Sequence, residues 1–181
     1  TATKPVTGEA YAAAAEVPAL PSVELTEDIL YDILVGEIAG QRGQFDIAIA
    51  SLGRVAERTR DPRLAERATL AAVYAKRYNE ALKNAELWVK LQPSSQQAHE
   101  SLASILMEVN KPSEARRHLE KALSIAASEQ TQDRAYRRIA SVLGRHQNRQ
   151  AAMEVMQALV DLDRANPNAY LALAHLAVRT D

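Results

Sequence analysis

The chain of 181 residues contains no cysteine and only four histidines. It can therefore form no disulfide bond and no thiolate metal site, and it has no cysteine nucleophile. The histidines are far apart in the sequence and none belongs to a motif such as H-E-x-x-H; His99 and His175 are better explained as core or groove residues. Phosphate-binding, dinucleotide-binding and nucleophile-elbow motifs are missing as well. The sequence thus predicts a protein that is not an enzyme and that binds neither a cofactor nor a metal.

Aromatic residues are also scarce, at 4% of the chain, and the formal net charge is only −1. Single-stranded nucleic acid is usually bound by stacking on aromatic rings, and duplexes by an excess of positive charge, so we expect no nucleic-acid partner. No apolar run reaches the length that a helix needs to cross a membrane. Because hydrophobic residues, many of them alanine, make up 47% of the chain, the composition favours an all-α fold with close helix packing.

A periodic pattern is clearest in residues 98–125, which predict two amphipathic helices joined by a polar turn at residues 110–112. Apolar residues recur at i, i+3, i+4 and i+7 on one face of the first helix, and a matching stripe follows on the second. The two stripes are formed by His99, Leu102, Ala103 and Leu106, and by Ala115, Leu119 and Ala122.

The same unit recurs along the chain with a period of roughly 34 residues, and its spacing of leucine, small and aromatic positions resembles the tetratricopeptide repeat (TPR). The resemblance implies an all-α fold, a right-handed α-solenoid of TPR helix-turn-helix repeats. Residues 24–181 would hold about four repeats plus the first helix of a fifth. The number of residues between equivalent positions is largest from the third to the fourth repeat, and the extra residues are assigned to a polar loop at residues 128–132. Equivalent positions in the five first helices are Asp32, Ala65, His99, Tyr136 and Tyr170.

Individual residues predict the ends of the helices and the seams between them. Thr26 is predicted to cap the first helix, and Asp61 followed by Pro62 to begin the third. Trp88 occupies a position that is small in most repeats. The small residues predicted to close the seams are Gly36, Ala48, Ala81, Ala103, Ala115, Ala140 and Ala152.

The two ends of the chain differ from the array. Residues 1–23, rich in alanine, proline and threonine, are predicted to be a flexible tether, the alternative being a short helix at Glu9–Glu16 that docks on a neighbour. The last helix begins at Pro167 and is apolar nearly all round, whereas a terminal helix needs a polar outer face. We therefore expect an N-terminal fragment of a longer protein; alternatively, this helix is the true end and packs in an oligomer. Its inward stripe is predicted to be Tyr170, Leu173, Ala174 and Ala177.

In this class of repeat the first helix of each pair lines the concave surface, so the helical register predicts which side chains lie there. They lean acidic in the middle of the array and basic in the fourth repeat, which either a solvated face or a partner-binding surface explains. In a partner-binding surface, the arginines of the fourth repeat would face an acidic part of the partner, and Glu66, Glu100 and Glu108 a basic part. The candidates are Glu37, Gln41, Arg63, Glu66, Tyr74, Gln97, Glu100, Ser104, Glu108, Arg134, Arg137, Ser141 and Arg145.

Repeat proteins that clamp a C-terminal carboxylate share a Lys, Asn, Asn, Lys, Arg set spread over three first helices. Here the first two slots hold Ile33 and Glu37, or Glu66 and Leu70 one repeat later. The sequence therefore does not predict a clamp of this kind.

Two stretches, LTEDILYDILVGEIAGQRG and TRDPRLAERAT, resemble the start of the repeat array in proteobacterial outer-membrane TPR lipoproteins. The likeness covers most of residues 24–110. It implies a periplasm-facing adaptor that binds a carboxy-terminal-processing protease and brings it substrates such as peptidoglycan hydrolases. The adaptor would meet the membrane only through an N-terminal lipid anchor that this chain does not include. The alternative is a generic peptide-binding TPR module in another compartment, such as a cytosolic assembly or chaperone-like cofactor.

Overall fold

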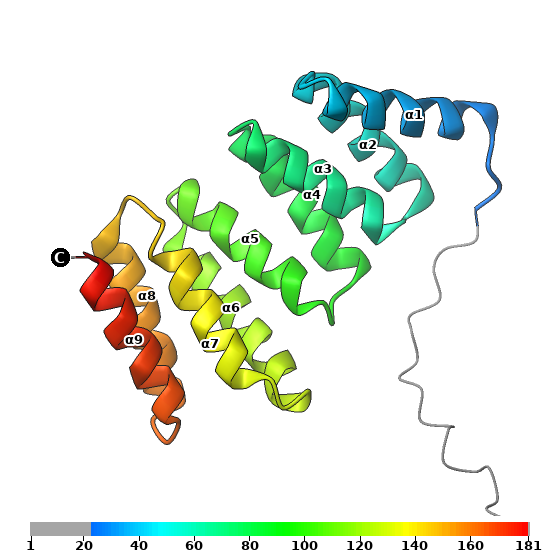
Figure 1. Ribbon diagram of the computed structural model, residues 1–181. Coiled ribbons are helices and arrows are strands. Elements are labelled where there is room, and N and C mark those ends of the chain that lie inside the picture. The colour runs from blue at the N-terminus through cyan, green and yellow to red at the C-terminus, as the bar shows by residue number, and fades with distance from the viewer. Residues whose placement is uncertain (1–22, 181) are drawn as a thin grey trace, which may run out of the picture.

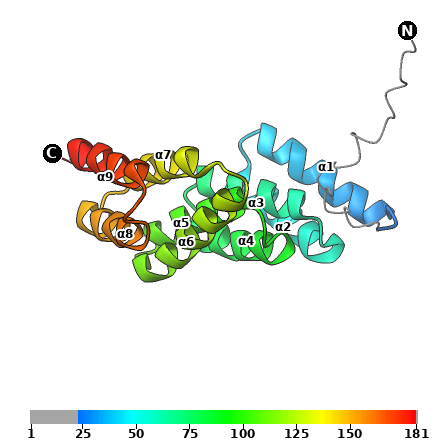
Figure 2. The ribbon, with the colours of Figure 1, turned by 90° about the horizontal axis from the view of Figure 1, so that it is seen from below.

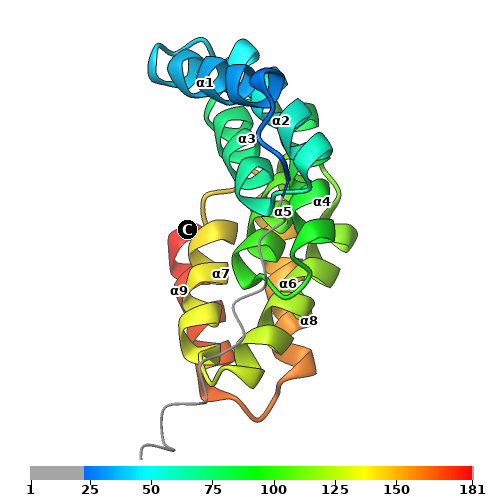
Figure 3. The same cartoon turned by 90° about the vertical axis from the view of Figure 1, so that its right-hand side faces the viewer.

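The computed structural model describes residues 23–180, and these residues form nine α-helices and no β-strand. The helices stack into an arc, with the odd-numbered helices on one side and the even-numbered helices on the other (Figures 1 and 3). This arrangement is an α-solenoid, as the sequence predicts. In chain order the helices are α1 (Glu27–Gln41), α2 (Phe45–Thr59), α3 (Pro62–Tyr74), α4 (Tyr78–Leu91), α5 (Gln96–Glu108), α6 (Pro112–Ser128), α7 (Gln132–Leu143), α8 (Arg149–Leu162) and α9 (Pro167–Thr180).

Residues 1–22 lie outside the described part of the chain. The tether at residues 1–23 and its alternative, a helix at Glu9–Glu16, therefore stay predictions. Within residues 23–180, no helix combines the length and the apolar character that crossing a bilayer would require.

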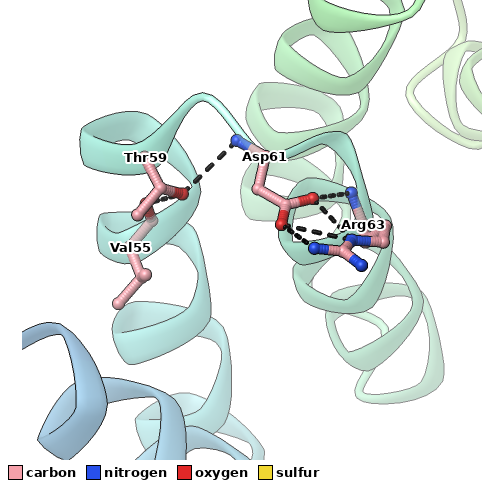
Figure 4. Close-up of polar contacts among 4 residues, drawn as sticks. All are labelled: Val55, Thr59, Asp61 and Arg63. Atoms are coloured by element: carbon pink, nitrogen blue, oxygen red, sulfur yellow. Dashed lines mark hydrogen bonds and ion pairs between the residues drawn. The ribbon is translucent and has the colours of Figure 1, made fainter. Parts of the chain in front are cut away.

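Short polar contacts set the ends of the helices, as the turn between α2 and α3 shows (Figure 4). The Asp61 carboxylate accepts a hydrogen bond from the backbone N–H of Arg63 at 2.9 Å and another from its guanidinium Nη2 at 2.6 Å. The Arg63 side chain thereby lowers the pKa of Asp61 below its usual range. The Thr59 hydroxyl donates to the Val55 carbonyl and accepts the Asp61 N–H. The predicted caps, Asp61 for α3 and Thr26 for α1, are both confirmed.

Small residues close the seams between the helices. Gly36 is the tightest point, because a Cβ atom there would lie only 2.7 Å from Leu52 Cγ. The seam between α1 and α2 therefore has no room for a side chain at this position unless Leu52 moves. The small residues predicted at seams are all buried: Gly36, Ala48, Ala81, Ala103, Ala115, Ala140 and Ala152.

Trp88, on α4, is 2% exposed and shares a buried cluster with Ala65, Ala68 and Ala98 of α3 and α5. An indole fits a position that is small in most repeats because the neighbouring helices contribute alanine there. Its Nε1–H donates to Gln92 Oε1 at 3.4 Å, so the buried polar atom has a partner.

The polar loop predicted at residues 128–132 is present but shorter than predicted. Helix α6 runs to Ser128 and α7 begins at Gln132, so that only residues 129–131 connect them. With 17 residues, α6 is three residues longer than the 14-residue α4, which is nearly one helical turn. Alanines near its end favour the helix, and the Ser128 hydroxyl donates to the Ile125 carbonyl at 2.7 Å. The extra residues of this repeat therefore lengthen a helix, and not a loop.

Helix α9 buries a different face from the one predicted. The predicted stripe is the face that a first helix turns toward the second helix of its own repeat. No helix follows α9 in the described chain, and α9 packs on α7 and α8. The buried residues are Ala169, Ala172 and Leu176, whereas the predicted Tyr170, Leu173, Ala174 and Ala177 are exposed or only partly buried.

Candidate functional site

Three cavities lie between successive odd-numbered helices and together form what we call the groove. Figure 2 shows α1, α7 and α9 rising above α3 and α5, so that this side of the stack is concave. The cavities have volumes of about 490 Å³ between α1 and α3, about 200 Å³ among α3, α5 and the end of α7, and about 350 Å³ between α7 and α9.

The structure places the candidate residues on the odd-numbered helices, with Arg145 just after the end of α7. Most of them line a cavity, and the remainder lie outside the cavity walls. The lining candidates are Arg63, Glu66, Gln97, Glu100, Ser104, Arg137, Ser141 and Arg145, and the others are Glu37, Gln41, Tyr74, Glu108 and Arg134.

Most acidic candidates already have partners within the protein. Arg67 Nη1 lies 2.6 Å from Glu37 Oε1, a close ion contact although that buried oxygen accepts no aligned hydrogen bond. Glu66 Oε1 accepts a hydrogen bond from Gln97 Nε2 at 2.9 Å. These contacts link α1 to α3 and α3 to α5, so they also hold neighbouring repeats together.

The Glu100 side chain is only 11% exposed. Burial raises its pKa, and two donors oppose this by stabilising the carboxylate: Arg138 Nε at 3.1 Å and Gln96 Nε2 at 2.8 Å. Glu100 would have to leave Arg138 before it could bind a basic group of a partner. Glu108 differs, because its carboxylate is exposed and makes no hydrogen bond or ion pair within residues 23–180.

The basic candidates of the fourth repeat are free by comparison. Arg134, Arg137 and Arg145 are exposed, and their guanidinium groups make no hydrogen bond or ion pair with any residue that the structure describes. Arg63 is different, since its guanidinium is held by Asp61. The positive charge of the groove therefore comes mainly from Arg137 and Arg145, with Arg134 one helical turn before Arg137 on α7.

The sequence analysis missed the apolar part of the groove, because it considered polar side chains almost exclusively. Leu70 is 50% exposed and lines two of the cavities, and Val73 lines one of them. Beside them, Tyr74 contacts Phe45, with ring centroids 4.9 Å apart. The register that places Tyr74 on this surface also places Leu70 one turn earlier, so the signal was present in the sequence.

A pair of histidines was also missed, on a different side of the fold. His99 Nδ1 lies 3.0 Å from His118 Nδ1, and His99 Nε2 lies 3.1 Å from the Pro93 carbonyl oxygen. Only an N–H can bond that carbonyl, so neutral His99 carries its proton on Nε2 and accepts a hydrogen bond from Nδ1–H of His118. No third ligand completes a metal site, since no cluster of three or more His, Cys, Asp or Glu side chains suited to a metal occurs in residues 23–180.

The histidine pair predicts that the protein loses stability in mild acid. Burial lowers the pKa of both rings; Lys121 lowers that of His99 further, and Arg117 lowers that of His118 while Glu114 raises it. The unfolded chain therefore binds protons at pH values where the folded chain does not. Stability should be complete above about pH 6.5 and should fall as the pH decreases below that value.

Thermal melts followed by circular dichroism, one above and one below about pH 6.5, would measure the loss of stability. His118→Gln should reduce the difference between the two melting temperatures, because one of the two titrating rings is gone. His175→Gln is the matched control, since His175 is exposed on α9, and it should keep the parent's pH dependence. A parent protein that melts at the same temperature at both pH values would contradict the prediction.

Comparison with known proteins finds a family model and a curated relative that match parts of this chain. The family model described as tetratricopeptide repeat matches residues 96–129, which span α5 and α6. A curated relative, TPR repeat-containing protein PA4667 of Pseudomonas aeruginosa, is 38% identical over 99 residues, which is 55% of this chain and 17% of that protein. The chain thus spans less than a fifth of the length of this relative.

Similar solved structures include MamA, with 16% identity, coverage of 86% of this chain and 84% of that chain, and a TM-score of 0.56. MamA 41-end from Desulfovibrio magneticus RS-1 has 21% identity, coverage of 86% and 87%, and a TM-score of 0.53. A tetratricopeptide repeat protein from Parabacteroides merdae has 14% identity, coverage of 86% and 61%, and a TM-score of 0.56. At these identities the likeness shows the fold alone.

Proposed function

We propose that this tetratricopeptide-repeat protein, a homologue of TPR repeat-containing protein PA4667, is a non-catalytic adaptor that binds a polypeptide in the groove. TPR arrays imply protein–protein interaction scaffolds, because stacked repeats present extended concave surfaces. The groove itself supports the proposal most directly: apolar side chains are exposed along it, and three arginines beside them have no partner among the described residues.

At a finer level, we propose an adaptor of the type represented by the lipoprotein LbcA. Such an adaptor lies on the periplasmic face of the outer membrane, binds a carboxy-terminal-processing protease and delivers substrates such as peptidoglycan hydrolases. Support comes from residues 25–43 and 59–69, which resemble the start of the repeat array in those lipoproteins. Attachment to the membrane would require an N-terminal lipid anchor upstream of this chain.

Reversing two groove charges should test this function. We expect the Arg134→Glu, Arg137→Glu double variant to bind a purified carboxy-terminal-processing protease about tenfold more weakly at low ionic strength, because attraction between exposed charges becomes repulsion. The difference should shrink as salt is added, since the screening length falls to about 3 Å at 1 M salt. Surface plasmon resonance at several salt concentrations would measure both effects.

The matched control is Lys90→Glu, Arg117→Glu on α4 and α6, which changes the charge equally on the opposite side of the stack and also breaks no ion pair among the described residues. It should bind the protease like the parent. Deleting residues 1–22 should also leave the affinity unchanged. Loss of binding in the deletion, with none in the arginine variant, would assign the protease contact to the N-terminal segment. A parent chain that binds peptides but no such protease would favour the generic peptide-binding module in another compartment.

A further inference from the structure

The cavity among α3, α5 and α7 combines apolar walls with a single free charge. Its apolar lining consists of Leu70 and Val73 from α3, Ile105 from α5 and Val142 from α7. Arg145 lies at the same cavity, directly beyond the end of α7. Its volume of about 200 Å³ is below the roughly 300–1,000 Å³ of typical small-molecule sites. It is therefore better suited to one or two side chains of a polypeptide than to a whole small ligand.

Most other polar groups in this cavity are already engaged. Glu100 is bonded to Arg138, the Gln97 amide donates to Glu66, and the Thr69 hydroxyl donates to a backbone carbonyl of its own helix. The Arg145 guanidinium has no partner within residues 23–180. An anion entering the cavity would therefore meet one uncompensated positive charge, and an apolar side chain would meet the aliphatic walls.

The cavity on the other side of α7 has the same combination. Arg137, also without a partner among the described residues, lines it together with Ala140 and Ser141 of α7 and the exposed His175 and Val178 of α9. Arg137 lies six positions before the end of α7 at Leu143, about 9 Å along the helix axis, and Arg145 lies two residues beyond that end, so the two positions are on the order of 10 Å apart. An extended chain rises about 3.3 Å per residue and its side chains alternate between two faces, so residues four positions apart cover this distance on one face.

We propose that the two cavities flanking α7 are paired subsites for an extended polypeptide whose acidic side chains are four positions apart, each two positions from an aliphatic residue. Arg145 and Arg137 each bind one carboxylate, and the adjoining apolar walls each receive one aliphatic side chain. The inference rests on the proposed function of the groove and adds the chemistry of the segment that it selects. Carboxylate and guanidinium form charge-assisted hydrogen bonds, which supply the selectivity.

The test uses the whole 181-residue chain and a blocked synthetic peptide, acetylated and amidated so that it has no terminal charge. The peptide carries two Leu-Ser-Glu units with the glutamates four positions apart and serine elsewhere, so that all leucine and glutamate side chains lie on one face of an extended chain. Fluorescence anisotropy should show saturable binding. Arg145→Gln should weaken it about tenfold, because the charge-assisted hydrogen bonds to one carboxylate are lost. Lys90→Gln on α4 is the control and should bind like the parent.

A double-mutant cycle tests whether Arg145 contacts a glutamate of the peptide directly. Two peptides, each with a different one of the glutamates changed to glutamine, should both lose affinity for the parent. With the peptide that lacks the glutamate bound by Arg145, the Arg145→Gln substitution should cause little further loss. Leu70→Ser should weaken the original peptide, because it removes an apolar wall. Equal binding of the glutamate and glutamine peptides, or no saturation up to about 1 mM peptide, would overturn the proposal.

The same variants separate this inference from the proposed function. If the parent captures the protease and Arg134→Glu, Arg137→Glu weakens capture while the peptides show no preference, only the subsite chemistry is wrong. If groove variants alter neither protease capture nor peptide binding, the groove itself is not the binding surface.

Discussion

Replacing Trp88 with alanine is expected to lower the free energy of unfolding by about 3–5 kcal/mol, the range for removing a buried aromatic side chain. Trp88 is 2% exposed and belongs to a cluster with Ala65, Ala68 and Ala98. Alanine side chains are too short to fill the space that the indole would leave. A cavity would therefore remain, and its cost would add to the loss of buried apolar area.

Urea unfolding followed by circular dichroism would measure the change. Trp88→Phe is the matched variant, because it keeps an aromatic ring and loses only part of the buried volume and the long hydrogen bond to Gln92; it should cost less than half as much. Trp88 is the only tryptophan in the chain, so its fluorescence in the parent reports unfolding around α4 directly. If Trp88→Ala unfolded at the parent's urea concentration, the packing of this cluster would have to be looser than the structure shows.

Unfolding of the Trp88→Ala variant should begin in the repeats around the substitution. In a repeat array each unit contacts mainly its neighbours, and stability is approximately a sum of repeat and interface contributions. The cluster around Trp88 draws on α1 to α5, whereas a second cluster extends through α9. We therefore expect Trp88→Ala to loosen the N-terminal repeats before the C-terminal ones, which hydrogen exchange would show as earlier loss of protection in α2 to α4.

Features that depend on neighbouring residues could be predicted from the sequence. A cap such as Thr26 or Asp61 bonds a backbone N–H only two or three positions ahead. The small residues at the seams follow from helical periodicity, since every turn of an inward stripe meets the same neighbour. These local rules were enough to give the α-solenoid, and with it the surface on which the groove lies.

Features that depend on how two helices are rotated against each other could not be predicted. Glu100 and Arg138 are 38 positions apart, and His99 and His118 are 19 apart on successive helices. Whether such side chains meet depends on helix rotations of a few tens of degrees, which the repeat period does not fix. The candidate site was affected most, because the sequence analysis treated Glu66 and Glu100 as free charges although both have partners.

The length of α6 is an intermediate case. Its alanine-rich end was consistent with either a helix or the start of a loop, and the polar residues 128–132 favoured the loop. In the structure, the helix continues to Ser128 and turns sharply at Gln130, whose φ of 56° is left-handed. Glutamine rarely adopts this conformation, so the sequence alone gave little sign of where the turn would fall.

Placing leucine at Ala103 is expected to lower the free energy of unfolding by roughly 1–3 kcal/mol, because a larger side chain overpacks a seam that has no space for it. Ala103 on α5 is 1% exposed, and Ala115 on α6 is fully buried. Alanine and leucine have similar helix propensities, so a loss would report packing and not helix formation. Ala127→Leu is the matched control on α6, since Ala127 is exposed; its effect should stay within about 0.5 kcal/mol.

The double variant Ala103→Leu, Ala115→Leu tests whether the two alanines share one seam. If they do, the displacement of α5 from α6 that admits the first leucine already makes room for the second. The combined loss should then be smaller than the sum of the two single losses, by about 0.5 kcal/mol or more. Urea unfolding of the parent, both single variants and the double variant gives this coupling directly. If the two single losses are strictly additive, Ala103 and Ala115 pack against different neighbours. If the Ala103→Leu variant is as stable as the parent, the assigned register of α5 is wrong.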